Sequence, residues 1–470
     1  GQEYGGYARL ATLIQQRRAV DENPLLLDAG DVFQGTIYFN VYEGLADLAF
    51  MNYVGYQAMA VGNHEFDRGP EPLRVFAELA EFPLLAANLD LSGDPALDAV
   101  VEPYTVVEVD GEPIGIVGNI TESIFAISSP GDTVALADQV ESIQASIDEL
   151  QADGVDKIIL LSHQGFGQDL NLVEQLEGVD LAIGGHSHTL LGNFDGHPFS
   201  GRGNYPTMVT DAAGREVPVV QAWQWGALLG RIVLEFDENG EVSEILEAQP
   251  IPVDESIEPD PVVETMVAGW MLPVADMVNQ VLSIAPVDIP RGPRSQLENP
   301  VGNILADAYL AAAQNAEAVV AFTNVGGVRA DIEAGDVTYG DLLTVAPFNN
   351  TLVILEVTGE ELLAALEHGA AGGGRLLPSA GTSYVVDLDA DFGNRVSEVV
   401  IDGEPLDLDA NYRIILNSFT AGGGDGHEVL RDAEGYRVDT GLLDIDALVE
   451  FVQQLETLEA EREGRIRPGN

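Results

Sequence analysis

The sequence contains no cysteine and only one lysine, Lys157, among its 470 residues. Without cysteine, the chain cannot form disulfides, zinc–thiolate sites or thiol nucleophiles. No run of 18 apolar residues is present, so we expect no membrane span. With 20 Lys and Arg against 78 Asp and Glu, the chain also lacks the basic stripe that binding to a nucleic-acid polymer requires.

The formal net charge of −58 is far from that of an ordinary protein of this size. The acidic residues are scattered singly or in pairs and are not collected in a tail. Such a surface repels itself unless salt screens the charges over short distances. We therefore expect adaptation to high salt, and acidity that serves solubility alone is the alternative.

The length of the chain favours two domains, because a single hydrophobic core seldom covers 470 residues. A segment rich in proline and acid, residues 248–262, precedes a stretch that we expect to be helical to about Ser283. We predict an N-terminal domain over residues 1–250, a linker with a helix over 251–285, and a C-terminal domain over 286–470.

Polar side chains follow the short apolar strands that alternate with helical patterns in the first half of the chain. The stretch "AIGGHSHTLLG", for example, ends an apolar run with two histidines. Because the carboxyl ends of parallel strands meet at one edge of a sheet, we expect these side chains to converge. They are Asp31, Asn63, His64, His163, His186 and His188.

This set of carboxylate, amide and imidazole groups suits a pair of divalent transition-metal ions. Asp31 could bridge the two ions, since a carboxylate has two oxygens. Any one of these histidines alone would more often be a structural residue, but metal sites need several convergent ligands, and here several are expected together. The sequence therefore predicts a metal centre at this edge.

The series "GD…GNHE…H…GHSH" resembles the calcineurin-like metallophosphoesterases. Further stretches, including "FTNVGGVRADI" and "NSFTAGGGDG", resemble their 5′-nucleotidase branch, which includes UDP-sugar hydrolases and cyclic-nucleotide phosphodiesterases. The resemblance implies an α/β fold class, with an N-terminal α/β/β/α metallophosphoesterase sandwich, a linker helix and a C-terminal α+β substrate-binding domain.

The resemblance also implies two divalent metal ions, which could be zinc, manganese, cobalt or magnesium. One ion would be bound by Asp31, Asn63, His163 and His186. The other would be bound by Asp31, His188 and an Asp-x-His motif.

In this family the Asp-x-His motif lies on the first strand, shortly before a segment that begins at Gly5 here, and none precedes Gly5. We expect that this strand is missing from the N-terminus of the chain as given, which leaves the activity of this chain open. A degenerate, non-catalytic derivative that still binds nucleotides is the alternative.

The resemblance further implies that hydroxide generated between the two metals attacks phosphorus. His64 would be oriented by Asp67 and would stabilise the transition state or protonate the leaving group. The alternative for His64 is a packing role behind the ligands.

In the C-terminal half, the resemblance assigns two aromatic side chains, Phe348 and Phe419, to a sandwich around the nucleobase. Asp425 would accept hydrogen bonds from the ribose hydroxyls, and Asn324 would contact the base. Each of these residues could otherwise be an ordinary part of the fold.

Two arginines complete the predicted substrate site. Arg329 in "NVGGVR" would bind phosphate through its guanidinium fork. Arg294 is the nearest match to a further phosphate-binding arginine, and it lies one residue out of register with the family pattern.

We therefore expect a hydrolase of nucleotide phosphate esters, most simply a 5′-nucleotidase that could also hydrolyse UDP-sugars. A 2′,3′-cyclic-nucleotide phosphodiesterase with 3′-nucleotidase activity is the alternative within the same enzyme class. The expected partner is a small nucleotide, in the periplasm, at the cell surface or outside the cell. The sequence does not predict an oligomeric state.

Overall fold

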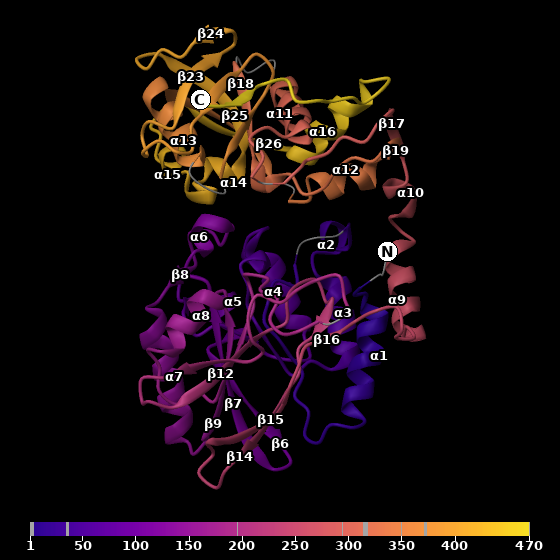
Figure 1. Cartoon of the computed structure of the whole chain (residues 1–470), viewed down its shortest axis with the longest axis vertical. Coiled ribbons are helices and arrows are strands. Elements are labelled where there is room, and N and C mark those ends of the chain that lie inside the picture. The colour runs from indigo at the N-terminus through magenta and orange to yellow at the C-terminus, as the bar shows by residue number, and fades with distance from the viewer. Residues whose placement is uncertain are drawn as a thin grey trace. The chain divides into compact units, whose positions relative to one another are not determined.

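The computed structural model describes residues 4–33, 37–194, 196–293, 295–313, 318–348, 350–370 and 374–469. The chain divides into two compact units. The first unit holds most of the chain as far as Leu272, and the second holds the chain from Pro273 onward together with two short earlier segments (Figure 1).

The first unit contains two main β-sheets. The smaller sheet is parallel, in the order β1-β2-β3-β5, and its strands are Leu27–Asp28, Ala58–Ala60, Leu84–Leu85 and Val101–Glu102. The larger sheet has the order β11-β12-β10-β9-β7-β6, with strands Thr207–Thr210, Glu216–Gln221, Leu181–Gly184, Lys157–His163, Glu112–Ile120 and Tyr104–Val109. Its four central strands run parallel, and the two edge strands are antiparallel to their neighbours.

Alternation of side chains along β7 explains how the layers of this unit pack. Ile116 faces the smaller sheet, where it joins a buried cluster with Ala58 and Leu85. The next residue, Val117, points to the other face and packs against Ile143 of α7. Helices α7 and α8 lie on one flank of the unit, and α1 and α3 lie on the other (Figure 1). The predicted α/β/β/α sandwich is confirmed.

The helices and smaller strand pairs of the first unit complete this architecture. The helices are α1 (Tyr7–Arg18), α2 (Ile37–Tyr42), α3 (Leu45–Val54), α4 (Pro70–Leu79), α5 (Pro95–Asp98), α6 (Ile124–Ile127), α7 (Gln139–Ala152), α8 (Phe166–Val173) and α9 (Pro261–Met271), with α2 and α6 shared between the units. The strand pairs are β4 (Leu89–Asp90) with β8 (Ala135–Leu136), β13 (Leu228–Leu229) with β16 (Ile251–Pro252), and β14 (Ile232–Phe236) with β15 (Val242–Ala248).

The second unit is built on a five-stranded sheet of order β21-β18-β25-β20-β26. Its strands are Leu376–Pro378, Val320–Asn324, Asn411–Asn417, Thr351–Thr358 and Arg437–Leu443. A four-stranded sheet, β24-β23-β22-β27, comprises Glu404–Pro405, Val396–Ile401, Ser383–Val386 and Ile466–Pro468. Helices α10 (Ala275–Val278), α11 (Pro300–Ala312), α12 (Tyr339–Val345), α13 (Gly359–Ala370), α14 (Ser418–Ala421), α15 (Glu428–Arg431) and α16 (Asp444–Gln453) accompany them.

The expectation of a helix as far as Ser283 is wrong. Helix α9 begins at Pro261, where the Asp260 side chain accepts hydrogen bonds from two backbone amides, and it ends at Met271. Pro273 follows almost at once, and proline lacks the N–H group that would continue the helix. After α10, the chain forms strand β17 (Val281–Ala285), which pairs antiparallel with β19 (Gly335–Thr338).

None of the helices in the described ranges is long and apolar enough to cross a lipid bilayer.

Candidate metal centre and substrate-binding residues

Three predicted ligands come together at the carboxyl edge of the sheets in the first unit. Asp31 lies just after β1, His163 is the last residue of β9, and His186 follows β10. One ligand atom from each of these residues lies within 4.8 Å of the other two. Asn63 joins them, because its Oδ1 lies 2.8 Å from Nδ1 of His186. The predicted convergence of these strand ends is therefore seen in the structure.

The His163 ring is oriented for binding a cation. Its Nδ1 lies 2.5 Å from the carbonyl oxygen of Ala29, so this nitrogen carries the hydrogen. The other ring nitrogen, Nε2, is buried 2.9 Å from Oδ2 of Asp31 but makes no hydrogen bond to any residue that the structure describes. An imidazole nitrogen and a carboxylate oxygen that face each other in this way fit a divalent cation.

Charge interactions at this edge favour an ionised Asp31. Burial tends to raise the pKa of Asp31, but His163 and His64 hold it well below its usual range. Burial tends to lower the pKa of His163, but the Asp31 carboxylate outweighs burial, so the pKa of His163 is raised overall. Burial and the neighbouring His163 lower the pKa of His186 to about 4, so that His186 is neutral at pH 7. A divalent cation held here would need Asp31 ionised and His163 without a proton on Nε2, because metal ligands must be deprotonated.

Glycines allow the close approach of the backbone at this edge. A Cβ on Gly30 would lie 2.7 Å from the Ala60 carbonyl oxygen and 2.9 Å from Nδ1 of His163. A Cβ on Gly62 would overlap Oδ1 of Asp31. Any other residue at these two positions would push the ligands apart.

Glu65 is a buried residue of the site that sequence reasoning missed. Its carboxylate accepts hydrogen bonds from the backbone N–H groups of Gly62, Asp31 and Phe33, at 2.6, 2.9 and 3.0 Å. Burial and the nearby Asp31 raise the pKa of Glu65 to about 7. Glu65 thus joins the loop after β1 to the loop after β2. The signal in the sequence was the position of Glu65 in "GNHEFD", two residues after the predicted ligand Asn63.

Two glutamines hold the loop that carries His186 and His188, and both were also missed. The Gln221 amide donates to the Gly185 carbonyl at 2.6 Å and accepts from the Thr189 N–H. Oε1 of Gln224 lies 3.0 Å from Nδ1 of His188, so this nitrogen donates and Nε2 is left with the lone pair. Both histidines have positive φ, 65° and 50°, which is a strained backbone conformation that is common at functional sites.

His64 forms a pair with Asp67 as predicted, at 2.6 Å between Nδ1 and Oδ2. The His64 backbone N–H donates to Oδ1 of Asp31 at 2.9 Å, which ties this residue to the metal edge. Burial tends to lower the pKa of His64, but Asp31 and Asp67 outweigh it and raise the pKa to about 9. His64 is therefore protonated at pH 7 in the absence of a cation.

In the second unit, Asn324 and Asp425 are in direct contact. Asn324 ends β18, and its Nδ2 donates to Oδ2 of Asp425 at 2.7 Å. Its Oδ1 accepts from Nδ2 of Asn417 at 3.0 Å. Asn417 is buried at the end of β25, and its own Oδ1 caps α14 by accepting from the Thr420 N–H. Asn417 is a third residue of this group that the sequence did not single out.

The two predicted aromatic residues of the second unit are half-buried. Phe419 lies against the glycine loop, since a Cβ on Gly424 would be 2.5 Å from its ring. Phe348 lies under the guanidinium of Arg329, with 5.3 Å between Cζ and the ring centroid. The structure thus places Arg329 beside an aromatic side chain. Arg294 lies outside the described residues.

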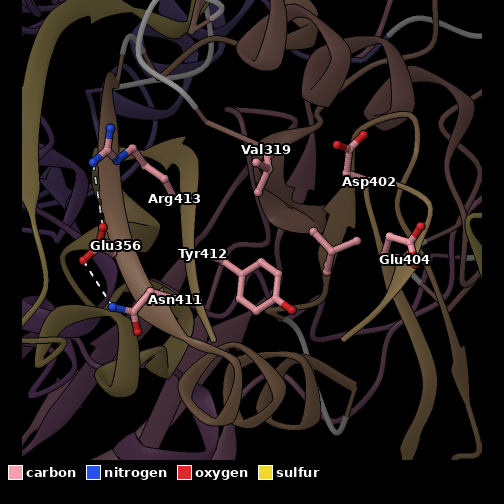
Figure 2. A pocket seen from close by; sticks show the side chains of 8 residues that line it. Val319, Glu356, Asp402, Glu404, Asn411, Tyr412 and Arg413 are labelled. Atoms are coloured by element: carbon pink, nitrogen blue, oxygen red, sulfur yellow. Dashed lines mark hydrogen bonds and ion pairs between the residues drawn. The ribbon is translucent and has the colours of Figure 1, made fainter. Parts of the chain in front are cut away.

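A pocket of about 410 Å³ in the second unit lies away from these residues (Figure 2). Its lining includes Glu356, Asn411 and Arg413, and Nδ2 of Asn411 lies 3.5 Å from Oε1 of Glu356. Asn411 and Arg413 are at the start of β25, whereas Asn417 and Phe419 are at and beyond its end. The pocket does not include any of the predicted substrate-binding residues that the structure describes.

Comparison with known proteins agrees with this geometry. Residues 3–190 match the calcineurin-like phosphoesterase family, and residues 280–432 match the C-terminal domain of 5′-nucleotidases. The 5′-nucleotidase of Homo sapiens is 35% identical over 493 residues, which cover 98% of this chain and 85% of the human protein. This chain belongs to the 5′-nucleotidase family.

A solved 5′-nucleotidase precursor from Thermus thermophilus has the same fold as this member of the 5′-nucleotidase family. It is 43% identical, with a TM-score of 0.89, and the match covers 100% of this chain and 94% of that one. The trifunctional nucleotide phosphoesterase of Bacillus subtilis is 35% identical over 509 residues, and this chain spans 34% of that longer protein. The predicted family and two-domain fold class are confirmed, and membership of the 5′-nucleotidase family makes this chain a phosphoric-ester hydrolase that uses divalent metal ions.

Proposed function

We propose that this protein is a metal-dependent 5′-nucleotidase, which hydrolyses nucleoside 5′-monophosphates to nucleoside and phosphate. The observation that carries the proposal is the convergence of Asp31, His163 and His186 within 4.8 Å, with Nε2 of His163 buried against the Asp31 carboxylate. Hydrolysis of UDP-sugars by the same site is a further part of the proposal.

Two divalent ions are proposed at the edge of the first unit. Asp31, Asn63, His163 and His186 would hold one of them, and Asp31 and His188 would contribute to the other. Such ions, when bound, supply Lewis-acid activation of water and neutralise charge on the phosphate oxygens. Imidazole, carboxylate and amide donors suit zinc, manganese or cobalt, and magnesium is a weaker match to the imidazoles.

His64 is proposed as the proton donor to the leaving oxygen, or as the cation that stabilises charge in the transition state. Its contact with Asp67 at 2.6 Å keeps the ring oriented and favours its protonated form. Asp31 and Asp67 are the two carboxylates that raise the pKa of His64. If bound cations neutralise the Asp31 carboxylate, Asp67 still favours the protonated form of His64. Asp67 is therefore a positioning residue.

Substrate recognition is assigned to the second unit. Asp425 and Asn324 would bind the ribose and the base, Phe348 and Phe419 would stack on the base, and Arg329 would bind phosphate. The proposed domain ranges remain 1–250 for the metallophosphoesterase domain, 251–285 for the linker and 286–470 for the substrate-binding domain.

We also propose that the protein works in a high-salt setting outside the cytoplasm. The net charge of −58 supports the salt requirement, and the family resemblance supports the location.

Release of inorganic phosphate from nucleoside monophosphates tests the proposal. The protein should hydrolyse AMP when zinc, manganese or cobalt is added in molar salt, and a chelator should stop the reaction. Adenosine should bind in the presence of the chelator, because none of the residues proposed to bind the nucleoside is a proposed metal ligand. Binding of adenosine with no phosphate release under any metal would instead support the non-catalytic alternative.

A further inference from the structure

The loop that carries Asp425 has an unfavourable backbone conformation. Asp425 has φ 55° and ψ 19°, and it lies between Gly423 at φ 98° and Gly426 at φ 82°. The left-handed conformation costs a residue with a side chain on the order of 1–2 kcal/mol. Contacts from elsewhere in the unit must therefore hold the loop in this form.

The side chain of Asp425 is held by Asn324, and its main chain is held by a histidine from another element. His368 is in the last turn of α13, and its Nε2 lies 2.9 Å from the backbone carbonyl oxygen of Asp425. A carbonyl oxygen only accepts, so Nε2 of His368 is the donor.

The chain packs closely around this bond. A Cβ on Gly426 would lie 2.9 Å from Cε1 and Nε2 of His368. On the other side, a Cβ on Gly374 would lie 2.8 Å from the Cβ of Asp425. Nε2 of the buried His427 also lies 2.6 Å from the Gly374 carbonyl, so His427 fixes the chain that packs behind Asp425.

We propose that His368 is a positioning residue for nucleoside recognition, which fixes the Asp425 main chain so that its carboxylate meets the ribose hydroxyls. This inference rests on the proposed function, in which Asp425 binds the nucleoside. His368 itself does not touch the substrate. Its effect is expected in the affinity for nucleosides and not in the chemistry at the metals.

The test compares His368→Phe, which keeps a ring over Gly426 but removes the donor, with His368→Gln, which keeps a donor at a similar reach. His368→Phe should raise KM for AMP and weaken adenosine binding about tenfold, the usual effect of one lost hydrogen bond. Hydrolysis of p-nitrophenyl phosphate should not change, and His368→Gln should restore AMP binding. Glu360→Gln, at the exposed start of the same helix, is the matched control.

A double-mutant cycle with Asp425→Ala separates positioning from general stability. In the Asp425→Ala background, His368→Phe should have no further effect on adenosine binding. An equal loss with and without Asp425, or equal losses on AMP and p-nitrophenyl phosphate, would overturn the inference. If His368→Phe does not melt cooperatively, His368→Leu is measured in its place.

The same experiment distinguishes failure of this inference from failure of the proposed function. If Asp425→Ala weakens adenosine binding but His368→Phe does not, the inference on His368 is wrong and the nucleoside site stands. If Asp425→Ala leaves adenosine binding unchanged, Asp425 does not recognise the nucleoside, and both proposals are overturned.

Discussion

Nδ1 of His64 lies 2.6 Å from Oδ2 of Asp67, and the His64 backbone N–H donates to the Asp31 carboxylate at 2.9 Å. His64 thus contacts Asp67 through its side chain and the proposed metal ligand Asp31 through its backbone. Asp31 and Asp67 together outweigh burial and raise the pKa of His64 to about 9. The pH dependence of the reaction should therefore depend on Asp67.

Asp67→Asn should lower kcat for AMP by about ten- to a hundredfold, the loss that removal of a hydrogen-bond partner behind a functional histidine typically causes. The substitution removes a negative charge, so the pKa of His64 falls and the alkaline limb of the kcat/KM profile should move to lower pH. The measurement is a pH–rate profile at constant salt, with the exposed Asp98→Asn as control. An alkaline limb that does not move would show that His64 is not the titrating group.

His186→Ala should abolish phosphate release, because it removes one of the three convergent ligands. Calorimetric titration with zinc or manganese should show weaker binding, whereas adenosine affinity should stay the same. His197→Ala is the matched control, since His197 is a histidine of the same unit that contacts Tyr4 at 2.9 Å, outside the cluster. Near-normal turnover in His186→Ala would contradict the ligand assignment.

Phe419→Ala should reduce kcat/KM for AMP by about 1–3 kcal/mol in transition-state binding, the contribution of one stacked base. The same variant should leave p-nitrophenyl phosphate hydrolysis unchanged, because that ester has no base to stack. Phe392→Ala serves as control, because Phe392 is a residue of the same unit that is 65% exposed. Equal losses on both substrates would mean that Phe419 is part of the packing.

Dilution of salt should destabilise the protein. At about 0.05 M KCl the screening length exceeds 10 Å, so the dispersed carboxylates repel one another, and molar salt shortens it to about 3 Å. The melting temperature should therefore rise with KCl over this range, as followed by calorimetry. A melting temperature that is independent of KCl would rule out adaptation to high salt.

Asp444 should make stability depend on pH. This buried residue begins α16, and burial raises its pKa to about 7 despite a hydrogen bond from Asn350. The folded protein then holds a proton that the unfolded chain releases near pH 4, so the free energy of unfolding should fall as pH rises from about 4 to 7.

Asp444→Asn should reduce this loss, by up to about 3 kcal/mol between pH 5 and pH 8 at roughly 1.4 kcal/mol per pKa unit. Denaturant unfolding at pH 5 and pH 8 in constant molar KCl measures it, with Asp409→Asn, at an exposed position of the same unit, as control. The same pH dependence in wild type and Asp444→Asn would mean that Asp444 is ionised in the folded protein.

The sequence predicted the first unit well where a residue ends a strand. Asp31, Asn63, His163 and His186 follow apolar strands, and the geometry of parallel strands brings such ends together. Glu65 and Gln221 were missed because they bond mainly to backbone groups distant in sequence. Glu65 accepts from the N–H groups of Asp31 and Phe33, and Gln221 donates to the Gly185 carbonyl, and no spacing rule encodes such partners. The helix expected to reach Ser283 failed for a local reason, since Pro273 interrupts it.

In the second unit, family motifs located Asn324 and Asp425, but the partners that hold them could not be predicted. Asn417 and His368 come from β25 and α13, and only the packed sheet brings them to the same loop. Sequence separation alone gives no sign of such contacts.

The amide of Asn324 is fixed at both ends, with its oxygen toward Asn417 and its nitrogen toward Asp425. An amide held in this way cannot turn over to exchange donor for acceptor when a different base arrives. The second N–H of Nδ2 and the second lone pair of Oδ1 are left for a base. Both point in fixed directions, because the amide cannot turn over. If Asn324 contacts the base as proposed, its discrimination among purines and pyrimidines would be rigid. Broad acceptance of bases would then have to come from the proposed aromatic faces, which make no such distinction.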